Sequence, residues 1–531
     1  MGILRQKQSP TNYSWTDGTP TVTTTNTPTG VFAYGLNNGL QLTLPADTTD
    51  RTVKLYMGVW DAQGRLEISL SDGSAPTFVD TSLINQTNVS NAVYTINYHA
   101  GTNGQTLIIR WTVNASFNAF GNVTLQAASL VSSGPAPTPT PTPAAEFQIS
   151  SSAPFAQLVT NIASDPNGNF VVAWQSLLQD GNGWGIFARR YDSAGLPQGN
   201  EFQVNTFTPG NQFVPRVAMD SLGNFAIVWE SFQVDGSGYG VSCQRFNAAG
   251  VALGGEFQVN TNTTDNQHDP YIAMAPNGAF VVVWSSNLQD GSLDGIYGQR
   301  FDSAGAPVGA EFHVSTFTNN IQGQPTVSMD ASGNFVVVWE SQGQDGSGYG
   351  AYMQRYNSSG VAQGGEVRVN TVTANDQAEP YVNLASGGSF VIAWASTSQD
   401  GDGIGVYAKR YNASGVAQGS EFRVNTFTSG DQTNPSVATD STGNFVIIWE
   451  SQGQDGSGKG IYGQRYNSSG VAQGSEFLVN TFTSSDQAYP FVTRAPAGNF
   501  VVVWTSSGQD GSNEGVYGKR FNSSGVPLNT P

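Results

Sequence analysis

Three glutamates in this chain share a local sequence and a fixed spacing. Each directly follows a tryptophan, and they stand 110 residues apart at Glu230, Glu340 and Glu450. Two carboxyl groups can cleave a glycosidic bond when one acts as an acid and the other as a base or nucleophile. A single active site needs unlike groups in unlike roles, whereas these three repeat alike. We therefore predict no catalytic residue and a protein that is not an enzyme, with a polysaccharide-active enzyme as an alternative.

No other catalytic arrangement stands out in the sequence. The histidines His99, His268 and His313 occupy unrelated positions. The sequence holds no nucleophile elbow, no metal-binding histidine pair and no phosphate-binding loop. The prediction of a non-catalytic protein follows from this as well.

Aspartates in glycine-rich loops are candidate ligands for a metal ion. An Asp-Gly pair recurs in every repeat, and two pairs of acids lie close together: Asp290 with Asp294, and Asp400 with Asp402. Carboxylate oxygens in such loops suit Ca²⁺, although the full ligand series of an EF-hand loop is missing. Because Asp-Gly also builds tight turns, we predict no cofactor and keep Ca²⁺ at these four residues as the alternative.

Aromatic side chains break the regularity of the repeats at two positions. Trp184, Tyr239 and Tyr349 occupy the most variable loop position, and Tyr271 and Tyr381 follow a proline in the first strand-like run of their repeats. An exposed aromatic ring can stack on a sugar while the sugar hydroxyls stay in water. We predict that these five residues form a ligand-binding face, with packing on a neighbouring loop as the alternative.

All these residues belong to a repeat of 55 residues. The repeat contains four strand-like runs separated by glycine-rich turns, and one run, such as Phe445 to Trp449, is apolar throughout. A strand tolerates this pattern when both its faces are covered, as in a blade between two other blades. The chain is therefore predicted to form a seven-bladed β-propeller of four-stranded blades. Seven tryptophans mark the blade cores: Trp174, Trp229, Trp284, Trp339, Trp394, Trp449 and Trp504.

The order of the runs predicts how the ring closes. The array begins with a fourth run at residues 146–149 and ends after a third run at residues 515–521. We predict that these two segments pair, so that the last blade contains strands from both ends of the array.

Each repeat also carries one arginine at the end of its third run and one glutamate at the start of its fourth run. Their spacing predicts a cross-strand ion pair. The arginines are Arg190, Arg245, Arg300, Arg355, Arg410, Arg465 and Arg520, and the glutamates are Glu146, Glu201, Glu256, Glu311, Glu366, Glu421 and Glu476.

The remainder of the chain predicts a second all-β module. Short runs of alternating apolar and polar residues favour a β-sandwich of jelly-roll type. A segment of alternating proline and threonine follows it and favours an extended spacer. The predicted domains are a flexible N-terminus at 1–11, the sandwich at 12–133, the Pro/Thr-rich linker at 134–145 and the propeller at 146–531.

Composition limits the partners. The formal net charge is −18 and the pI about 4.4, which argues against nucleic acid and anionic membranes. The sequence contains no run of 18 apolar residues, so we predict no membrane insertion. The first residues lack the apolar stretch of a signal peptide. Cys243 is the single cysteine, so an internal disulfide is excluded. An all-β protein rich in small polar residues favours an extracellular or cell-surface location.

The repeats resemble a known kind of protein. Residues 333–341 read Gly-Asn-Phe-Val-Val-Val-Trp-Glu-Ser and residues 344–350 read Gln-Asp-Gly-Ser-Gly-Tyr-Gly. These motifs resemble the tandem repeats of large bacterial secreted and surface proteins, and the N-terminal module resembles the accessory, often carbohydrate-binding sandwiches attached to such proteins. The resemblance implies an extracellular binding or adhesion protein whose partner is a glycan or another surface protein. A structural component of a surface layer or filament that assembles with itself is an alternative.

Overall fold

The computed structural model describes residues 2–6, 13–15, 24–27, 31–48, 50–132, 146–150, 156–511 and 513–529. The chain divides into two compact units, Met1–Pro141 and Thr142–Pro531. The predicted linker at 134–145 lies outside the described residues. Among the described residues, no helix is long and apolar enough to cross a membrane.

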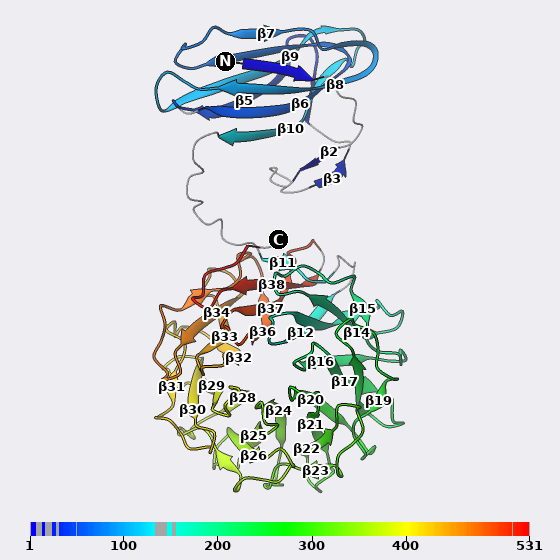
Figure 1. Cartoon of the computed structure of the whole chain (residues 1–531), viewed down its shortest axis with the longest axis vertical. Helices are drawn as coiled ribbons and strands as arrows, with labels where there is room; N and C mark the ends of the chain where they lie inside the picture. Colours follow the sequence, from blue (N-terminus) through cyan, green and yellow to red (C-terminus); the bar gives the residue numbers. More distant parts are fainter. Residues whose placement is uncertain are drawn as a thin grey trace. The chain divides into compact units, whose positions relative to one another are not determined.

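The second unit is a ring of seven four-stranded antiparallel sheets, which confirms the predicted propeller (Figure 1). The innermost strands surround the centre of the ring: β12 (Gln157–Ser164), β16 (Gln212–Met219), β20 (Gln267–Met274), β24 (Gln322–Met329), β28 (Gln377–Leu384), β32 (Gln432–Thr439) and β36 (Gln487–Arg494). The second strands are β13 (Phe170–Leu177), β17 (Phe225–Phe232), β21 (Phe280–Asn287), β25 (Phe335–Gln342), β29 (Phe390–Thr397), β33 (Phe445–Gln452) and β37 (Phe500–Ser507). The third strands are β14 (Trp184–Tyr191), β18 (Tyr239–Phe246), β22 (Asp294–Phe301), β26 (Tyr349–Tyr356), β30 (Ile404–Tyr411), β34 (Lys459–Tyr466) and β38 (Glu514–Phe521). Two-residue outer strands complete the sheets: β11 (Phe147–Gln148), β15 (Phe202–Gln203), β19 (Phe257–Gln258), β23 (Phe312–His313), β27 (Val367–Arg368), β31 (Phe422–Arg423) and β35 (Phe477–Leu478). Blades 1 to 6 start at β12, β16, β20, β24, β28 and β32, and blade 7 consists of β36, β37, β38 and β11.

The ring closes as the sequence predicts. Strand β11 pairs antiparallel with β38, with Phe147 opposite Gly518 and Gln148 opposite Tyr517. The backbone N–H of Ile149 adds a hydrogen bond of 2.8 Å to the carbonyl of Val516. Blade 7 therefore contains strands from both ends of the array.

The second strands form the stable part of each blade. In each of them the first seven residues are buried, and all seven repeat tryptophans are fully buried. Trp284 of blade 3, for example, lies in one apolar cluster with Ala226 and Val228 of blade 2. Burying one such apolar side chain contributes roughly 1.5 to 3 kcal/mol, so the blade faces dominate stability.

The predicted ion pair between the repeated arginines and glutamates is wrong, because both groups bind the backbone of a neighbouring blade. Arg300 of blade 3 donates hydrogen bonds of 2.6 and 2.9 Å to the carbonyls of Ser359 and Ser358 in blade 4. Glu366 of blade 4 accepts the N–H of Thr316, which follows the outer strand of blade 3, at 2.8 Å. Backbone carbonyl and N–H groups in loops, which lack a partner in a strand, require another hydrogen-bond partner, and these charged side chains provide it. The two groups thus join blades instead of strands.

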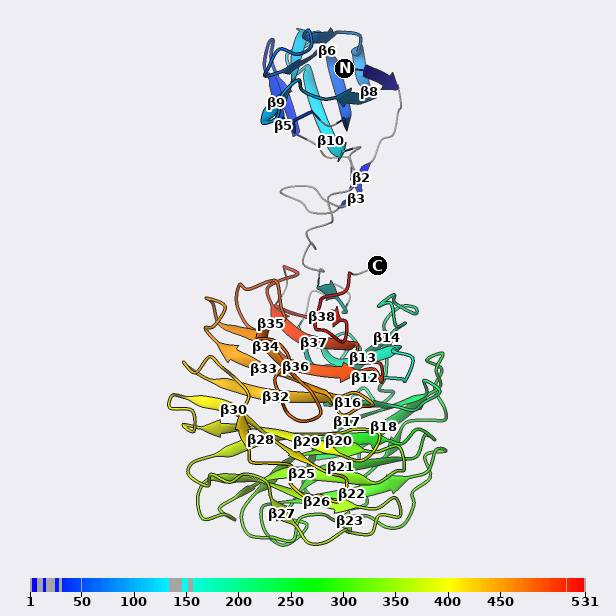
Figure 2. The ribbon, with the colours of Figure 1, turned by 60° about the vertical axis from the view of Figure 1, so that its left-hand side comes forward.

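The N-terminal unit is also all-β. Its strands are β1 (Gly2–Gln6), β2 (Tyr13–Trp15), β3 (Thr24–Thr27), β4 (Val31–Tyr34), β5 (Gly39–Ala46), β6 (Arg51–Leu70), β7 (Phe78–Asp80), β8 (Ile84–Tyr98), β9 (Gln105–Ser116) and β10 (Asn122–Ser132). Strands β2 and β3 pair with each other, and the other eight form one sheet (Figure 2). Strand β1, within the segment expected to be flexible, pairs with β8.

One long strand organises this sheet. The first half of β6 pairs with β8 and β10, and its second half pairs mainly with β9 and β7. The change of partners falls at Asp61, whose φ of 44° marks a break in the register. The predicted alternation is confirmed along β6, where Leu66, Ile68 and Leu70 are buried together with Trp111 of β9.

Candidate active site

The seven inner strands share an irregularity at their third residue. Each third residue has a positive φ of 48–53°, and the register with the second strand shifts at this point. A proline follows in every inner strand but β12, and the position before proline disfavours helical conformations, so these residues are strained. The seven are Val159, Val214, Asp269, Gln324, Glu379, Asn434 and Tyr489.

These seven residues line one pocket of about 260 Å³ in the centre of the ring. We call it the acidic pocket, because its lining includes two acidic residues, Asp269 from blade 3 and Glu379 from blade 5. Strained residues that the fold holds in place are frequent at functional sites. The pocket therefore combines a rigid backbone ring with side chains that differ from blade to blade.

Buried glutamates hold the two acids of the pocket in place. Glu230 Oε1 accepts the backbone N–H of Asp269 at 2.7 Å, and Glu340 Oε2 accepts that of Glu379 at 3.0 Å. Glu230 and Glu340 are only 7% and 6% exposed. Each fixes the strained backbone from which a pocket acid projects.

Burial changes the acidity of these glutamates. It raises the pKa of Glu230 to about 7, with a further contribution from the charge of Asp269. It also raises the pKa of Glu340 to about 7, although the hydrogen bond from the N–H of Glu379 lowers it, and Glu379 and Asp269 add to the rise as charges. Near neutral pH the site therefore holds carboxyl groups that gain and lose protons.

The surroundings of Glu379 favour its protonated form. Burial raises its pKa, and the charge of Glu450 raises it further, while the hydrogen bond from Asn434 N–H and the charge of Lys459 lower it. Its Oε2 accepts the backbone N–H of Asn434 at 2.6 Å. A buried carboxyl with a raised pKa beside a cavity suits a general acid.

Asp269 has different neighbours. Its Oδ2 lies 3.0 Å from Nδ1 of His268, whose Nε2 lies 3.3 Å from Oδ1 of Asp294. Burial lowers the pKa of His268, but the hydrogen bonds and charges of both aspartates outweigh burial and raise it to about 10. Asp269 thus forms an ion pair with the His268 imidazolium.

Glu450 holds a third position of the ring. Its Oε1 accepts the N–H of Tyr489 at 2.6 Å, and its Oε2 lies 2.8 Å from Nζ of Lys459. Burial lowers the pKa of Lys459, but the hydrogen bond and the charge of Glu450 outweigh burial and raise it. Although the three repeated glutamates are alike, they hold an aspartate, a glutamate and a tyrosine.

Two of the predicted ligand-binding residues, Tyr271 and Tyr381, form the floor of the acidic pocket. Their hydroxyl groups are joined by a hydrogen bond of 2.6 Å. The Arg216 guanidinium lies 5.5 Å from the ring centre of Tyr271 and 5.1 Å from that of Phe491. Burial raises the pKa of both tyrosines. These side chains separate the acidic pocket from a second cavity at the other end of the ring, which they also line in part.

The other three predicted ligand-binding residues begin third strands and are half-buried. Trp184 and Tyr239 both pack on Phe213, at ring distances of 6.3 and 6.1 Å. Burial raises the pKa of Tyr349, and the charge of Glu340 adds to the rise. The structure brings Trp184 and Tyr239 together and leaves Tyr349 in blade 4.

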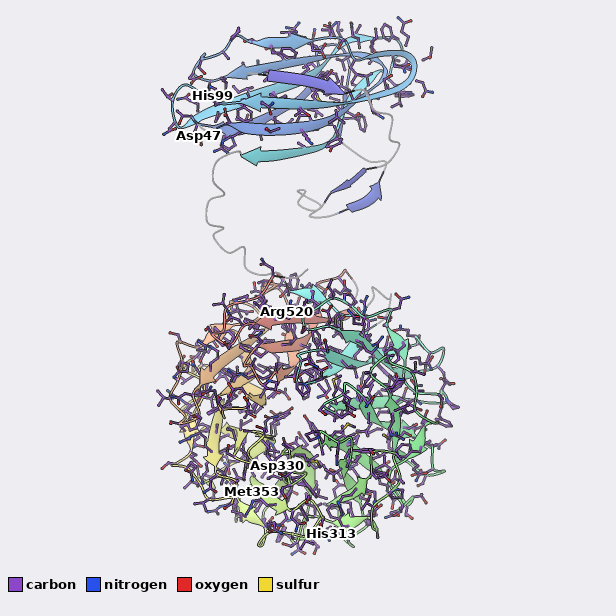
Figure 3. The ribbon with its side chains drawn as sticks, in the orientation of Figure 1. Asp47, His99, His313, Asp330, Met353 and Arg520 are labelled. Atoms are coloured by element: carbon purple, nitrogen blue, oxygen red, sulfur yellow. The ribbon has the colours of Figure 1, made fainter. Side chains whose placement is uncertain are left out.

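The four candidate calcium ligands have protein partners. Asp290 Oδ2 lies 3.7 Å from Nε2 of His313, which stands at the periphery of the ring (Figure 3), and Asp294 contacts His268. Oδ2 of Asp400 accepts a hydrogen bond from Asn425, and Oδ2 of Asp402 accepts one from the N–H of Gly430. In the part of the chain that the structure describes, no group of three or more His, Cys, Asp or Glu residues could hold a metal ion.

The Asp-Gly pairs build turns, as predicted. Asp180 Oδ1 accepts the N–H of Asn182 at 3.1 Å, and Gly181 has a φ of 95°. Oδ2 of Asp180 accepts a hydrogen bond from Asn205 at 3.0 Å.

Comparison with known proteins shows no family for this chain and finds distantly similar solved structures. No family model matches the chain, and no curated protein matches it. A solved α-L-arabinanase of Penicillium chrysogenum is 12% identical with a TM-score of 0.43, covering 72% of this chain and 99% of its own. The Hadza microbial sialidase Hz136 is 11% identical with a TM-score of 0.38, covering 90% and 94%. The NanB sialidase of Streptococcus pneumoniae is 10% identical with a TM-score of 0.40, covering 94% and 99%.

These neighbours correct the predicted function. The sequence predicted a non-catalytic binding or adhesion protein, whereas three solved structures similar to this chain are two sialidases and an arabinanase. We therefore withdraw the non-catalytic prediction. At these identities and scores the likeness carries no argument for a particular reaction, so the chemistry must be derived from the acidic pocket.

Sequence reasoning missed Asp269 and Glu379. Both occupy the residue before the inner-strand proline, where the side chain changes in every repeat except the first two. The same kind of variation drew attention to Trp184 and Tyr239. A search for variable positions beside the inner-strand prolines would have found the two acids.

Proposed function

We propose that this protein cleaves glycosidic bonds, with Glu379 and Asp269 as its catalytic residues. The observation that carries the proposal is the placement of two carboxyl groups on one pocket, each fixed by a buried glutamate of the preceding blade. Two carboxyl groups with different environments are what glycoside hydrolysis requires.

The environments of the two acids assign their roles. Glu379, whose pKa burial raises, gives its proton to the glycosidic oxygen as the bond from that oxygen to the anomeric carbon breaks. Asp269, whose Oδ2 lies 3.0 Å from Nδ1 of His268, acts as the carboxylate that faces the positive charge developing on the sugar. Water then adds its hydroxyl group to the anomeric carbon and gives a proton to Asp269. One proton is donated and one is accepted, so the reaction needs no other reactant.

Four predictions from the sequence continue as parts of this proposal. The N-terminal unit serves as an accessory jelly-roll module, residues 134–145 as a Pro/Thr spacer, and the protein acts outside the cell. The reaction is proposed to need no cofactor; calcium at Asp290 with Asp294 or Asp400 with Asp402 stays the alternative and would be structural, because none of these acids lines the acidic pocket.

A release assay tests the proposal. The full chain is incubated with arabinan, xylan, mixed-linkage β-glucan, galactomannan, polygalacturonate and sialyllactose, and new reducing ends are measured. We expect the wild type to release reducing ends from at least one of these substrates. The Glu379→Gln variant should hydrolyse that substrate at least ~100-fold more slowly. A matched Thr493→Val variant, which loses a hydroxyl group in the second cavity, should keep the wild-type rate. Absence of release from all six, or equal rates for wild type and Glu379→Gln, contradicts the proposal.

A further inference from the structure

On the face of the ring that carries the acidic pocket, aromatic side chains are concentrated in one sector. Three residues of blade 2 beside the pocket are aromatic: Phe213, Phe232 and Tyr239. Blade 1 adds Trp184. The ring is otherwise a repeat, so this concentration is a property of one sector and not of the blade design.

In blade 3 the same three positions are His268, Asn287 and Asp294, which bind one another. In blade 6 they are Thr433, Gln452 and Lys459. In these two blades polar or charged groups replace the aromatic rings, whereas blade 4 keeps one aromatic residue, Tyr349, at the position of Tyr239.

The four aromatic side chains form a continuous line. Phe213 lies between Trp184 at 6.3 Å and Tyr239 at 6.1 Å, and Tyr239 lies 5.2 Å from Phe232. Successive ring planes are tilted by 42–57°, and all four side chains are half-buried. Each ring is supported by its neighbour and keeps part of its surface in solvent, which suits stacking against a ligand.

This aromatic line begins at the rim of the acidic pocket. Phe213 precedes Val214, which lines the pocket and whose N–H donates to Gln175 Oε1 at 3.0 Å. Burial raises the pKa of Tyr239, and the charge of Glu230 adds to the rise. Glu230 in turn holds Asp269, so the line reaches the pocket on the side of Asp269.

The polar groups beside the line are mostly uncharged amides. Asn211 Oδ1 accepts the N–H of Trp184 at 3.2 Å, and Asn266 Oδ1 accepts that of Tyr239 at 3.0 Å. Asp180 and Asp235, the nearby loop acids, accept hydrogen bonds from Asn205 and Asn260. Aromatic rings with amides suit the apolar faces and hydroxyl groups of uncharged sugars.

We propose that a neutral polysaccharide chain extends from the acidic pocket over Phe213, Tyr239 and Trp184, so that the preferred substrate is a polymer and not a single terminal sugar. This inference rests on the proposed function and names its substrate class. The chain enters the pocket between Asp269 and Glu379 and lies across blades 1 and 2.

Binding of polysaccharides tests the inference without turnover. The full chain carrying Glu379→Gln is run in native gels containing xylan, mixed-linkage β-glucan, galactomannan or linear arabinan, with polygalacturonate as the charged comparison. We expect retardation by at least one neutral polymer, and an affinity about tenfold or more lower when Trp184→Ala and Tyr239→Ala are added. Ile404→Ala, at the position of Trp184 in blade 5, is the matched control and should bind normally. Trp184→Phe with Tyr239→Phe should restore most of the affinity, which separates stacking from misfolding.

Three outcomes overturn the inference. The first is unchanged polymer binding after the double alanine change, and the second is an equal loss of binding in Ile404→Ala. The third is retardation by polygalacturonate alone or by no polymer, and this third outcome would indicate a protein partner for this sector. Its failure is distinguishable from failure of the proposed function. If the wild type hydrolyses a polymer and short oligosaccharides of the same sugar equally well, and the double alanine variant does too, only the inference fails. If neutral polymers bind through Trp184 and Tyr239 but are never cleaved, only the catalytic proposal fails.

Discussion

The two ends of the propeller channel are built from the same seven inner strands and differ in chemistry. The acidic pocket at the start of these strands has a volume of about 260 Å³, and the cavity at their end, which we call the opposite cavity, about 250 Å³. Tyr271 and Tyr381 line both and separate them. Equal size and equal scaffolding therefore do not make the two ends equivalent.

Uncharged side chains in the opposite cavity connect neighbouring blades. Asn161 Oδ1 accepts the N–H of Val217 at 2.9 Å, and Ser328 Oγ accepts that of Leu384 at 3.0 Å. Arg494, a cation of this cavity, lies 3.2 Å from Asp440. These groups thus form contacts within the ring.

In the acidic pocket, carboxyl groups accept backbone N–H groups of the inner strands. Glu230, Glu340 and Glu450 accept the amides of strained residues, although burial of a carboxylate is unfavourable. In the opposite cavity, uncharged amide and hydroxyl oxygens accept the backbone N–H groups. Burial raises the pKa of two of these carboxyl groups, Glu230 and Glu340, and the following experiments test whether the protein uses that altered acidity.

The largest expected effect separates the two catalytic roles. With a polysaccharide that the wild type cleaves, Glu379→Gln should lower kcat/KM by about 10²–10⁴-fold. With a dinitrophenyl glycoside of the same sugar the loss should be much smaller, because that leaving group departs without a proton. Asp269→Asn should lower kcat/KM for both substrates. Equal losses for both substrates in Glu379→Gln would remove Glu379 as the acid.

The next effect is the dependence of stability on pH. Between the ordinary pKa of 4.5 and about 7, the unfolded chain releases protons that Glu230 and Glu340 retain in the fold. Their contribution to the free energy of unfolding is therefore full below pH 4.5 and is lost as pH rises toward 7, by on the order of 2–3 kcal/mol for each group.

Glutamine at both positions keeps an oxygen that can accept the amide and removes this titration. The double variant Glu230→Gln/Glu340→Gln should show a flatter curve of unfolding free energy against pH, measured by urea denaturation from pH 4 to 8. Identical curves for the variant and the wild type would show that the two carboxyl groups do not titrate in this range.

A smaller effect is expected in the opposite cavity. Asn383 Oδ1 accepts the N–H of Thr439 at 3.0 Å and its hydroxyl group at 2.7 Å. Asn383→Ala removes this link between blades 5 and 6 and should lower the free energy of unfolding by about 1 kcal/mol. The hydrolysis rate should not change. A loss of activity without a loss of stability would contradict the division of labour between the two ends.

The smallest expected effect is a displacement of the pH profile. Because the charge of Lys459 lowers the pKa of Glu379, Lys459→Met should move the alkaline limb of kcat/KM to higher pH. Lys409→Met is the matched control, since Lys409 donates to the carbonyl of Val369. A shift to lower pH in Lys459→Met would show that another group controls this limb.

Much of the fold is predictable from the sequence because its signals are local and repeated seven times. The apolar run from Phe445 to Trp449 indicates a strand covered on both faces, and the phase of the array predicts the pairing of β11 with β38. The ion pair between repeated arginines and glutamates was predicted wrongly, because hydrogen bonds between blades depend on neighbours that strand order alone does not show.

The candidate site was only partly predictable. Glu230, Glu340 and Glu450 are conspicuous beside their tryptophans, but their similarity suggested a structural role. Their three partners, Asp269, Glu379 and Tyr489, lie 39 residues further on, and nothing local links them.

The sequence by itself determined the seven blades, their apolar cores and the closure of the ring, because each depends on periodic burial that recurs every 55 residues. Only the tertiary structure decided that Asp269 and Glu379 share one pocket and that buried glutamates hold them there. The physical reason is that a ring brings single residues from distant repeats to a common centre, and burial at that centre sets the pKa of Glu379.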